Sequence, residues 1–96
     1  MIPKNRAPAH PGEILDRIFL KDIGLSQSEL AKHLGWKPGK VNEIVNGKRG
    51  ITPESALALA DALGTDSEMW LNLQTNFDLW QAKLHHRPIK PIKIGA

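Results

Sequence analysis

Apolar residues recur along the chain at the three- and four-residue spacing of amphipathic helices, and glycine or proline separates the apolar segments. The stretch after residue 84 departs from this spacing, because its prolines cannot continue a helix. The pattern predicts five helices: one after His10 that ends before Gly24, one between Ser26 and Gly35, one from about residue 37 to about residue 46, one between Thr52 and Gly64, and one from about residue 65 to about residue 84. We therefore expect a compact, all-α domain of five helices.

Three of the predicted helices begin with a capping signal. Ser26 is followed three residues later by Glu29, which predicts a capping box, where each side chain bonds the backbone N–H of the other residue. Thr65 and Glu68 have the same spacing and predict a second capping box at the fifth helix. Thr52 precedes a proline, which is favoured in a first helical turn, so Thr52 is the expected cap of the fourth helix.

The inward faces of the helices follow from the same spacing. In the first four helices they are predicted to be Ile14, Leu15, Ile18, Phe19, Leu30, Ala31, Leu34, Val41, Ile44, Val45, Ala56, Leu57, Ala60 and Leu63. In the fifth helix Trp70 is predicted to lie in the core, and Leu73, Phe77 and Trp80 continue its stripe. Short helices leave much of this stripe uncovered, and an exposed aromatic face usually marks a partner surface. We expect Leu73, Phe77 and Trp80 to form a dimer interface.

The second and third predicted helices are joined by a tight turn after Gly35, and lysines surround the apolar face of the third. This arrangement is typical of a helix-turn-helix, which places its second helix in the DNA major groove. An ordinary helical hairpin without a ligand explains the apolar pattern but explains the lysines less well. DNA contact is therefore the better hypothesis.

The candidate DNA-contacting residues lie in the first turn of the second helix, on the outer face of the third, and in the loop that follows. They are Gln27, Lys37, Lys40, Asn42, Glu43, Asn46, Lys48 and Arg49. Glu43 is expected to accept from a cytosine amino group, and Arg49 to reach a guanine edge. Pro38 and Gly39 offer no side chain that bonds a base, so recognition is expected to depend more on DNA shape and phosphates.

Charge is segregated along the chain, although the net charge is only +3. Residues 37–49 hold four basic side chains and one acid, and residues 83–96 hold four basic side chains and no acid. Between them, residues 50–82 hold five acids and neither lysine nor arginine. This segregation predicts a phosphate-facing side and a separate acidic side.

Several functional classes are disfavoured by composition. Cysteine is absent, which excludes disulfides and thiolate sites. The four histidines lack a metal-ligand spacing, and neither a nucleophile elbow nor a glycine-rich phosphate loop occurs. We therefore predict no catalytic residue, no metal and no cofactor, and expect a protein that is not an enzyme. Since neither a membrane-length apolar run nor a signal-peptide core is found, the expected location is the cytoplasm, without a membrane partner.

The chain divides by composition into three parts. Residues 1–9 form an N-terminal arm, residues 10–84 form the helix-turn-helix domain with a C-terminal dimerisation helix, and residues 85–96 form a basic extended tail. In the tail, isoleucine and lysine alternate over residues 89–94. Either this segment pairs as a strand with a partner, or it is disordered.

Five motifs make the chain resemble a known family: HPGEIL at residues 10–15, GLSQ at 24–27, EIVNGKRGIT at 43–52, ADALGT at 60–65 and WLNLQ at 70–74. Their order and spacing resemble those of HigA-type antitoxins, within the lambda-repressor-like helix-turn-helix family. The resemblance covers residues 10–80. It implies a homodimer that represses its own operon at a palindromic DNA operator and neutralises a partner toxin, usually a ribosome-dependent mRNA endonuclease. It also implies that Gln27, in the first turn of the second helix, holds a DNA phosphate.

Such a toxin must be basic to bind RNA, so the acids of its inhibitor are the candidate toxin contacts. They are Glu54, Asp61, Glu68 and Asp78. Two other interpretations remain open: a stand-alone helix-turn-helix transcriptional repressor without a toxin partner, and an inhibitor that has lost DNA binding.

Overall fold

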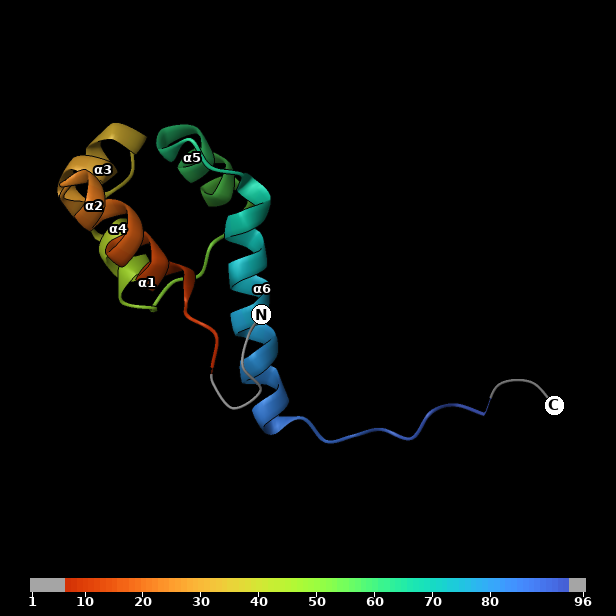
Figure 1. The fold of residues 1–96 in the computed structure, drawn as a ribbon. Coiled ribbons are helices and arrows are strands. Elements are labelled where there is room, and N and C mark those ends of the chain that lie inside the picture. The colour runs from red at the N-terminus through yellow and green to blue at the C-terminus, as the bar shows by residue number, and fades with distance from the viewer. Residues whose placement is uncertain (1–6, 94–96) are drawn as a thin grey trace.

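The computed structural model describes residues 7–93, and within them the predicted all-α architecture is confirmed (Figure 1). Residues 1–6 of the predicted arm and residues 94–96 of the predicted tail lie outside the described range. The first predicted helix comprises three consecutive segments, α1 (Pro11–Ile14), η1 (Leu15–Leu20) and α2 (Lys21–Ile23). The other four are α3 (Gln27–Leu34), α4 (Pro38–Val45), α5 (Pro53–Leu63) and α6 (Ser67–His85).

The middle of the first helix is π-helical, and this changes which side chains face inward. The Lys21 N–H donates to the Asp16 carbonyl, five residues back, so the turn is wider than in an α-helix. Leu15 and Leu20, five residues apart, are both buried. The prediction that Ile18 faces inward is wrong: its side chain is 51% exposed, because the predicted spacing assumed α-helical turns.

The helix-turn-helix is formed by α3 and α4, as predicted. Ser26 and Glu29 make the expected capping box, with both side chain to backbone bonds at 3.0 Å. The bond from the Ser26 N–H stabilises the Glu29 carboxylate and lowers its pKa. Gly35 ends α3 in the left-handed conformation, at a φ of 73° that favours glycine. Val41 and Ile44 are fully buried, so the inner face of α4 packs in the core.

The N-terminus of α5 follows the prediction, but its buried face does not. The Thr52 hydroxyl accepts from the Ser55 N–H at 3.2 Å and caps the helix. Leu57 was predicted to face inward and is 58% exposed, whereas Leu59 is fully buried. Alternating alanine and leucine in this segment leave two apolar stripes possible, and packing selects the stripe that contains Ala56 and Leu59.

The predicted capping box of Thr65 and Glu68 is wrong. Asp66 occupies the N-cap position of α6, and the Thr65 hydroxyl accepts instead from the indole N–H of Trp70 at 2.8 Å. A buried indole N–H needs an acceptor, and Thr65 supplies it. Glu68 accepts from the Ser67 hydroxyl at 2.7 Å, which lowers the pKa of the Glu68 carboxyl.

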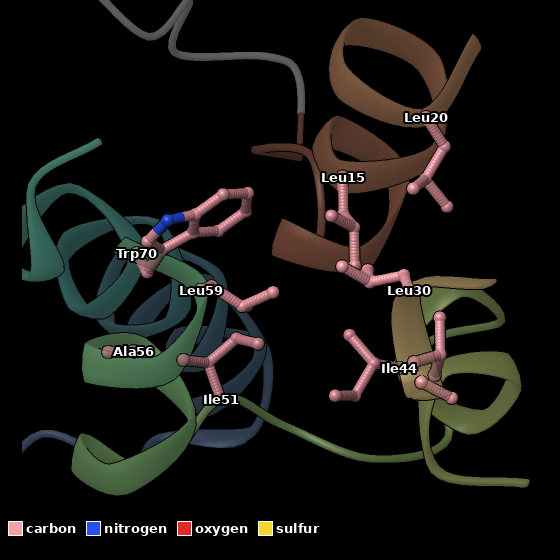
Figure 2. Packing of buried hydrophobic residues seen from close by; sticks show 10 residues of the cluster. Leu15, Leu20, Leu30, Ile44, Ile51, Ala56, Leu59 and Trp70 are labelled. Atoms are coloured by element: carbon pink, nitrogen blue, oxygen red, sulfur yellow. The ribbon is translucent and has the colours of Figure 1, made fainter. Parts of the chain in front are cut away.

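The hydrophobic core joins α5 and α6 to η1, α3 and α4. Trp70 is fully buried, as predicted, and its ring lies 5.4 Å from that of Phe19 between centroids. Figure 2 shows Trp70 and Leu59 facing Leu15, Leu30 and Ile44 across this core.

Helix α1 packs closely against α4 at Gly12. A Cβ at Gly12 would overlap the carbonyl oxygen of Ile44 and lie 2.9 Å from the Cα of Val45. Only glycine therefore fits here, and this contact sets the position of α4 relative to the rest of the domain.

Helix α6 extends beyond the other helices, and residues 86–93 continue from it as an extended, exposed segment (Figure 1). The helix ends at His85, one residue later than predicted. Among the residues described, no helix combines the length and apolar character that crossing a membrane requires.

Candidate nucleic-acid interface

The eight residues predicted to contact DNA are all exposed or half-buried, and they belong to α3, α4 and the segments flanking α4. Val41 and Ile44 are fully buried, so the remaining face of α4 is left for a ligand. Lys37 takes the N-cap position of α4, and Asn46 takes its C-cap position. The structure therefore gathers the predicted residues around a single helix.

A chain of amide side chains links α3 to α4. The Asn42 amide donates to the Gln27 side-chain oxygen at 3.1 Å, and Asn46 donates to the Asn42 oxygen at 3.2 Å. Because the Gln27 oxygen is occupied, its amide N–H groups remain as donors, which suits a phosphate. These bonds hold three of the candidate residues in a fixed relation.

Glu43 and Arg49 form an ion pair. One Glu43 carboxylate oxygen accepts from Arg49 Nη2 at 2.9 Å and from Nε at 3.2 Å. Both side chains are about half exposed, and a solvated pair of this kind is worth about 0–1 kcal/mol. Exchanging this carboxylate for another acceptor would therefore cost the arginine little free energy. The pair also holds the arginine in place before any ligand binds.

Lys40 is oriented by Trp36, which precedes α4. The Lys40 ammonium lies 4.1 Å from the centroid of the Trp36 ring, a cation–π distance. Trp36 is half-buried and packs against the hydrophobic core. Its ring therefore serves both as part of the apolar surface and as a platform for a candidate DNA-contacting lysine.

Residues 46–51, which we call the 46–51 loop, fold back onto the end of α4. The Lys48 and Arg49 N–H groups both donate to the Glu43 carbonyl, at 2.8 and 3.2 Å. Gly47 adopts a φ of 73°, the left-handed conformation that this reversal requires. At the far end of the loop, the Ile51 N–H donates to the Gln74 side-chain oxygen of α6 at 2.7 Å. The loop is thus anchored at both ends.

Sequence reasoning missed two residues that support this site. Gln74 bonds the loop, and His10 caps α1 by accepting from the Gly12 N–H through Nδ1 at 2.9 Å. The His10 ring meets the Phe77 ring edge-on, with centroids 4.9 Å apart. Burial lowers the pKa of His10, although the charges of Asp78 and Glu13 oppose this shift. For His10 the available signal was its place directly before Pro11, at the start of a helix; the partner of Gln74 is too distant in sequence for a local signal.

The stripe on α6 loses burial towards the C-terminus. Trp70 is fully buried, while Leu73, Phe77 and Trp80 are half-buried. Leu84, one turn further along, is 61% exposed. Part of the Phe77 ring is covered by His10. Trp80 and Leu84 therefore contribute more of the apolar surface that remains exposed on α6.

The four candidate toxin-contacting acids are exposed and lie on two helices. Glu54 and Asp61 belong to α5, and Glu68 and Asp78 belong to α6. Asp78 accepts from the Gln74 amide at 2.8 Å and so takes part in the anchor of the 46–51 loop.

Comparison with known proteins identifies the fold and its relatives. A helix-turn-helix family model matches residues 17–70. The chain is 48% identical over 90 residues to virulence-associated protein I of Dichelobacter nodosus, covering 93% of this chain and 83% of that protein. It is similar to the structure of the antitoxin GraA, with 44% identity, a TM-score of 0.82, and coverage of 85% of this chain and 88% of that one.

A second solved structure is that of the Pseudomonas aeruginosa antitoxin HigA with the higBA promoter. It is 35% identical to this chain, with a TM-score of 0.82, and the match covers 90% of this chain and 99% of that one. The sequence identity and the near-complete coverage show common descent as well as a common fold. The chain therefore belongs to the helix-turn-helix family and, within it, to the HigA-type antitoxins.

Proposed function

We propose that this protein is a DNA-binding antitoxin that represses its own operon and neutralises a partner toxin. The observation that carries the proposal is the set of ordered polar and basic side chains around α4, in a chain related to an antitoxin solved with its promoter. Arg49 and Lys40 are the expected contacts to base edges or to phosphates, and Gln27 is expected to hold a phosphate at the start of α3.

The operator is a palindrome read by a homodimer. The exposed end of the α6 stripe, at Trp80 and Leu84, supports a second copy of this chain as the partner, because a two-fold axis pairs the same surface with itself. Two α4 helices related by this axis read half-sites about one helical turn apart.

The toxin is expected to be a small basic mRNA endonuclease held on a different surface. The acids at Glu54, Asp61 and Glu68 lie outside the helix-turn-helix, so this arrangement leaves DNA and toxin able to bind together. Asp78 is the weakest of the four candidates, because Gln74 already bonds its carboxylate.

The test of DNA binding measures the affinity for the protein's own promoter by fluorescence anisotropy at several salt concentrations. Arg49→Ala and Lys40→Ala should each weaken binding by about 1–3 kcal/mol if they read bases. Arg17→Ala, which removes an exposed basic side chain of the first helix, is the matched control and should change little. Unchanged affinity in both variants would reject this reading surface. Operator binding by a protein that has no toxin gene beside its own would instead identify a stand-alone repressor.

A further inference from the structure

The 46–51 loop reaches α6 through a single side chain. The Gln74 oxygen accepts from the Ile51 N–H at 2.7 Å, and the Gln74 amide nitrogen donates to Asp78 at 2.8 Å. Gln74 also lies so close to Gly50 that a Cβ there would come within 3.1 Å of its amide group. One glutamine thus closes the loop against α6.

The orientation of the Gln74 amide follows from its two partners. A backbone N–H only donates, so the group facing Ile51 must be the oxygen. A carboxylate only accepts, so the group facing Asp78 must be the nitrogen. Donor and acceptor are therefore fixed at each end of the bridge. Substitution can exchange donor and acceptor in the bond between residues 74 and 78 while an acceptor for the Ile51 N–H is kept.

We propose that Gln74 is a positioning residue for DNA binding, acting through Arg49; the proposal rests on the proposed function. Arg49 lies between two anchors: its own N–H is bonded to the Glu43 carbonyl, and Ile51, two residues later, is bonded to Gln74. Without the second anchor the loop samples more conformations, and DNA must then restrict them at an entropic cost. Gln74 thus sets the affinity of a surface that it does not touch.

The first experiment compares Gln74→Met, a near-isosteric change that removes both bonds, with Gln81→Met, the same change at an exposed position of α6. Operator binding should weaken about three- to tenfold in Gln74→Met, consistent with the loss of one or two ordinary hydrogen bonds. Gln81→Met should bind as the wild type does. Thermal unfolding of both variants shows how much of the lost operator affinity is explained by a less stable fold.

A double-mutant cycle separates positioning from general stability. If Gln74 acts through Arg49, adding Gln74→Met to Arg49→Ala should cause little further loss of operator affinity. A purely structural role predicts additive losses, and additivity would overturn the proposal. If Arg49→Ala alone binds like the wild type, the assigned DNA surface fails and this proposal fails with it. If Arg49→Ala weakens binding while Gln74→Met does not, only this proposal fails.

A charge-conserving exchange provides the rescue. Gln74→Glu keeps an acceptor for the Ile51 N–H but places two carboxylates together, so operator binding should weaken. Adding Asp78→Asn restores the hydrogen bond in the opposite direction, because the new amide at residue 78 donates to the new carboxylate at residue 74. Operator affinity should then return to within about twofold of the wild type. This pair carries the test if Gln74→Met does not fold. Failure of the double variant to recover, while it unfolds like the wild type, would reject the bridge as the determinant.

Discussion

Gly12 and Ile44 bring the backbones of α1 and α4 into direct contact: the space that a side chain at Gly12 would need is filled by the Ile44 carbonyl. The contact lies on the inner side of the helix whose outer face carries the candidate DNA contacts. It therefore fixes the depth at which α4 sits in the domain.

Gly12→Ala should destabilise the fold by about 2–3 kcal/mol, because the added methyl group must displace the backbone of α4. Gly39→Ala is the matched control: it lies in the first turn of α4 with no atom within 4 Å of the added Cβ, and should be neutral or mildly stabilising. Chemical denaturation of both variants measures the difference. Equal stability of the two would contradict the close packing described here.

Acidification should destabilise the protein through His10. Burial lowers its pKa below the ordinary value of 6.5, so the folded protein binds fewer protons than the unfolded chain just below that pH. The contribution of His10 to the free energy of unfolding is complete above about pH 6.5 and is lost as the pH falls below it. Protonation of Nδ1 would also remove the acceptor for the Gly12 N–H.

The measurement is thermal unfolding between pH 7.5 and about 5.5, above the range in which most carboxylates titrate. His10→Asn keeps a side-chain acceptor suited to a helix cap but does not titrate, so its stability should vary less with pH. A variant with the same pH dependence as the wild type would show that another group is responsible.

Trp80→Ala should weaken the proposed homodimer by about 2 kcal/mol or more, because tryptophans at interface centres often dominate association. Sedimentation velocity at several concentrations follows the dimer dissociation constant. Leu57→Ala, at an exposed apolar residue of α5, should leave the dimer unchanged. A wild type that is monomeric at micromolar concentration would contradict the dimer itself.

Charge reversal at Asp61 and Glu68 should slow association with a basic toxin and make the rate less sensitive to salt, because long-range attraction mainly affects encounter. Asp22→Lys, on α2, is a control that changes the net charge at an exposed residue of another helix. Stopped-flow binding at two salt concentrations measures both effects. If these variants associate normally and deletion of residues 1–10 or of residues 85–96 abolishes binding, the deleted segment carries the inhibitory contact instead.

Local signals made much of the fold predictable. The partner of Ser26 is three residues away, and Gly35 ends its helix through its own backbone conformation, so both were readable from short stretches. The inward faces of the helices were harder to predict. Ile18 was misassigned because a π-helical segment changes the helical period, and Leu57 because two stripes in α5 were equally apolar.

Two contacts of the candidate DNA-binding surface were not predictable from local pattern. Gln74 bonds a residue 23 positions earlier, and no spacing rule within a helix indicates a partner at that distance. The pairing of Glu43 with Arg49 depends on a loop that reverses direction after α4, so both were predicted as independent base contacts.

The pairing of Glu43 with Arg49 also bears on how such a protein finds one site among the many in a chromosome. An arginine that already has a carboxylate partner adds less net charge to the surface. It therefore contributes less to non-specific binding to the phosphates of DNA. Competing sites far outnumber an operator, so weak attachment to them matters as much as tight attachment to the target. If Arg49 contacts the operator as proposed, Glu43 is therefore expected to weaken binding to wrong sites, at a small cost in total affinity.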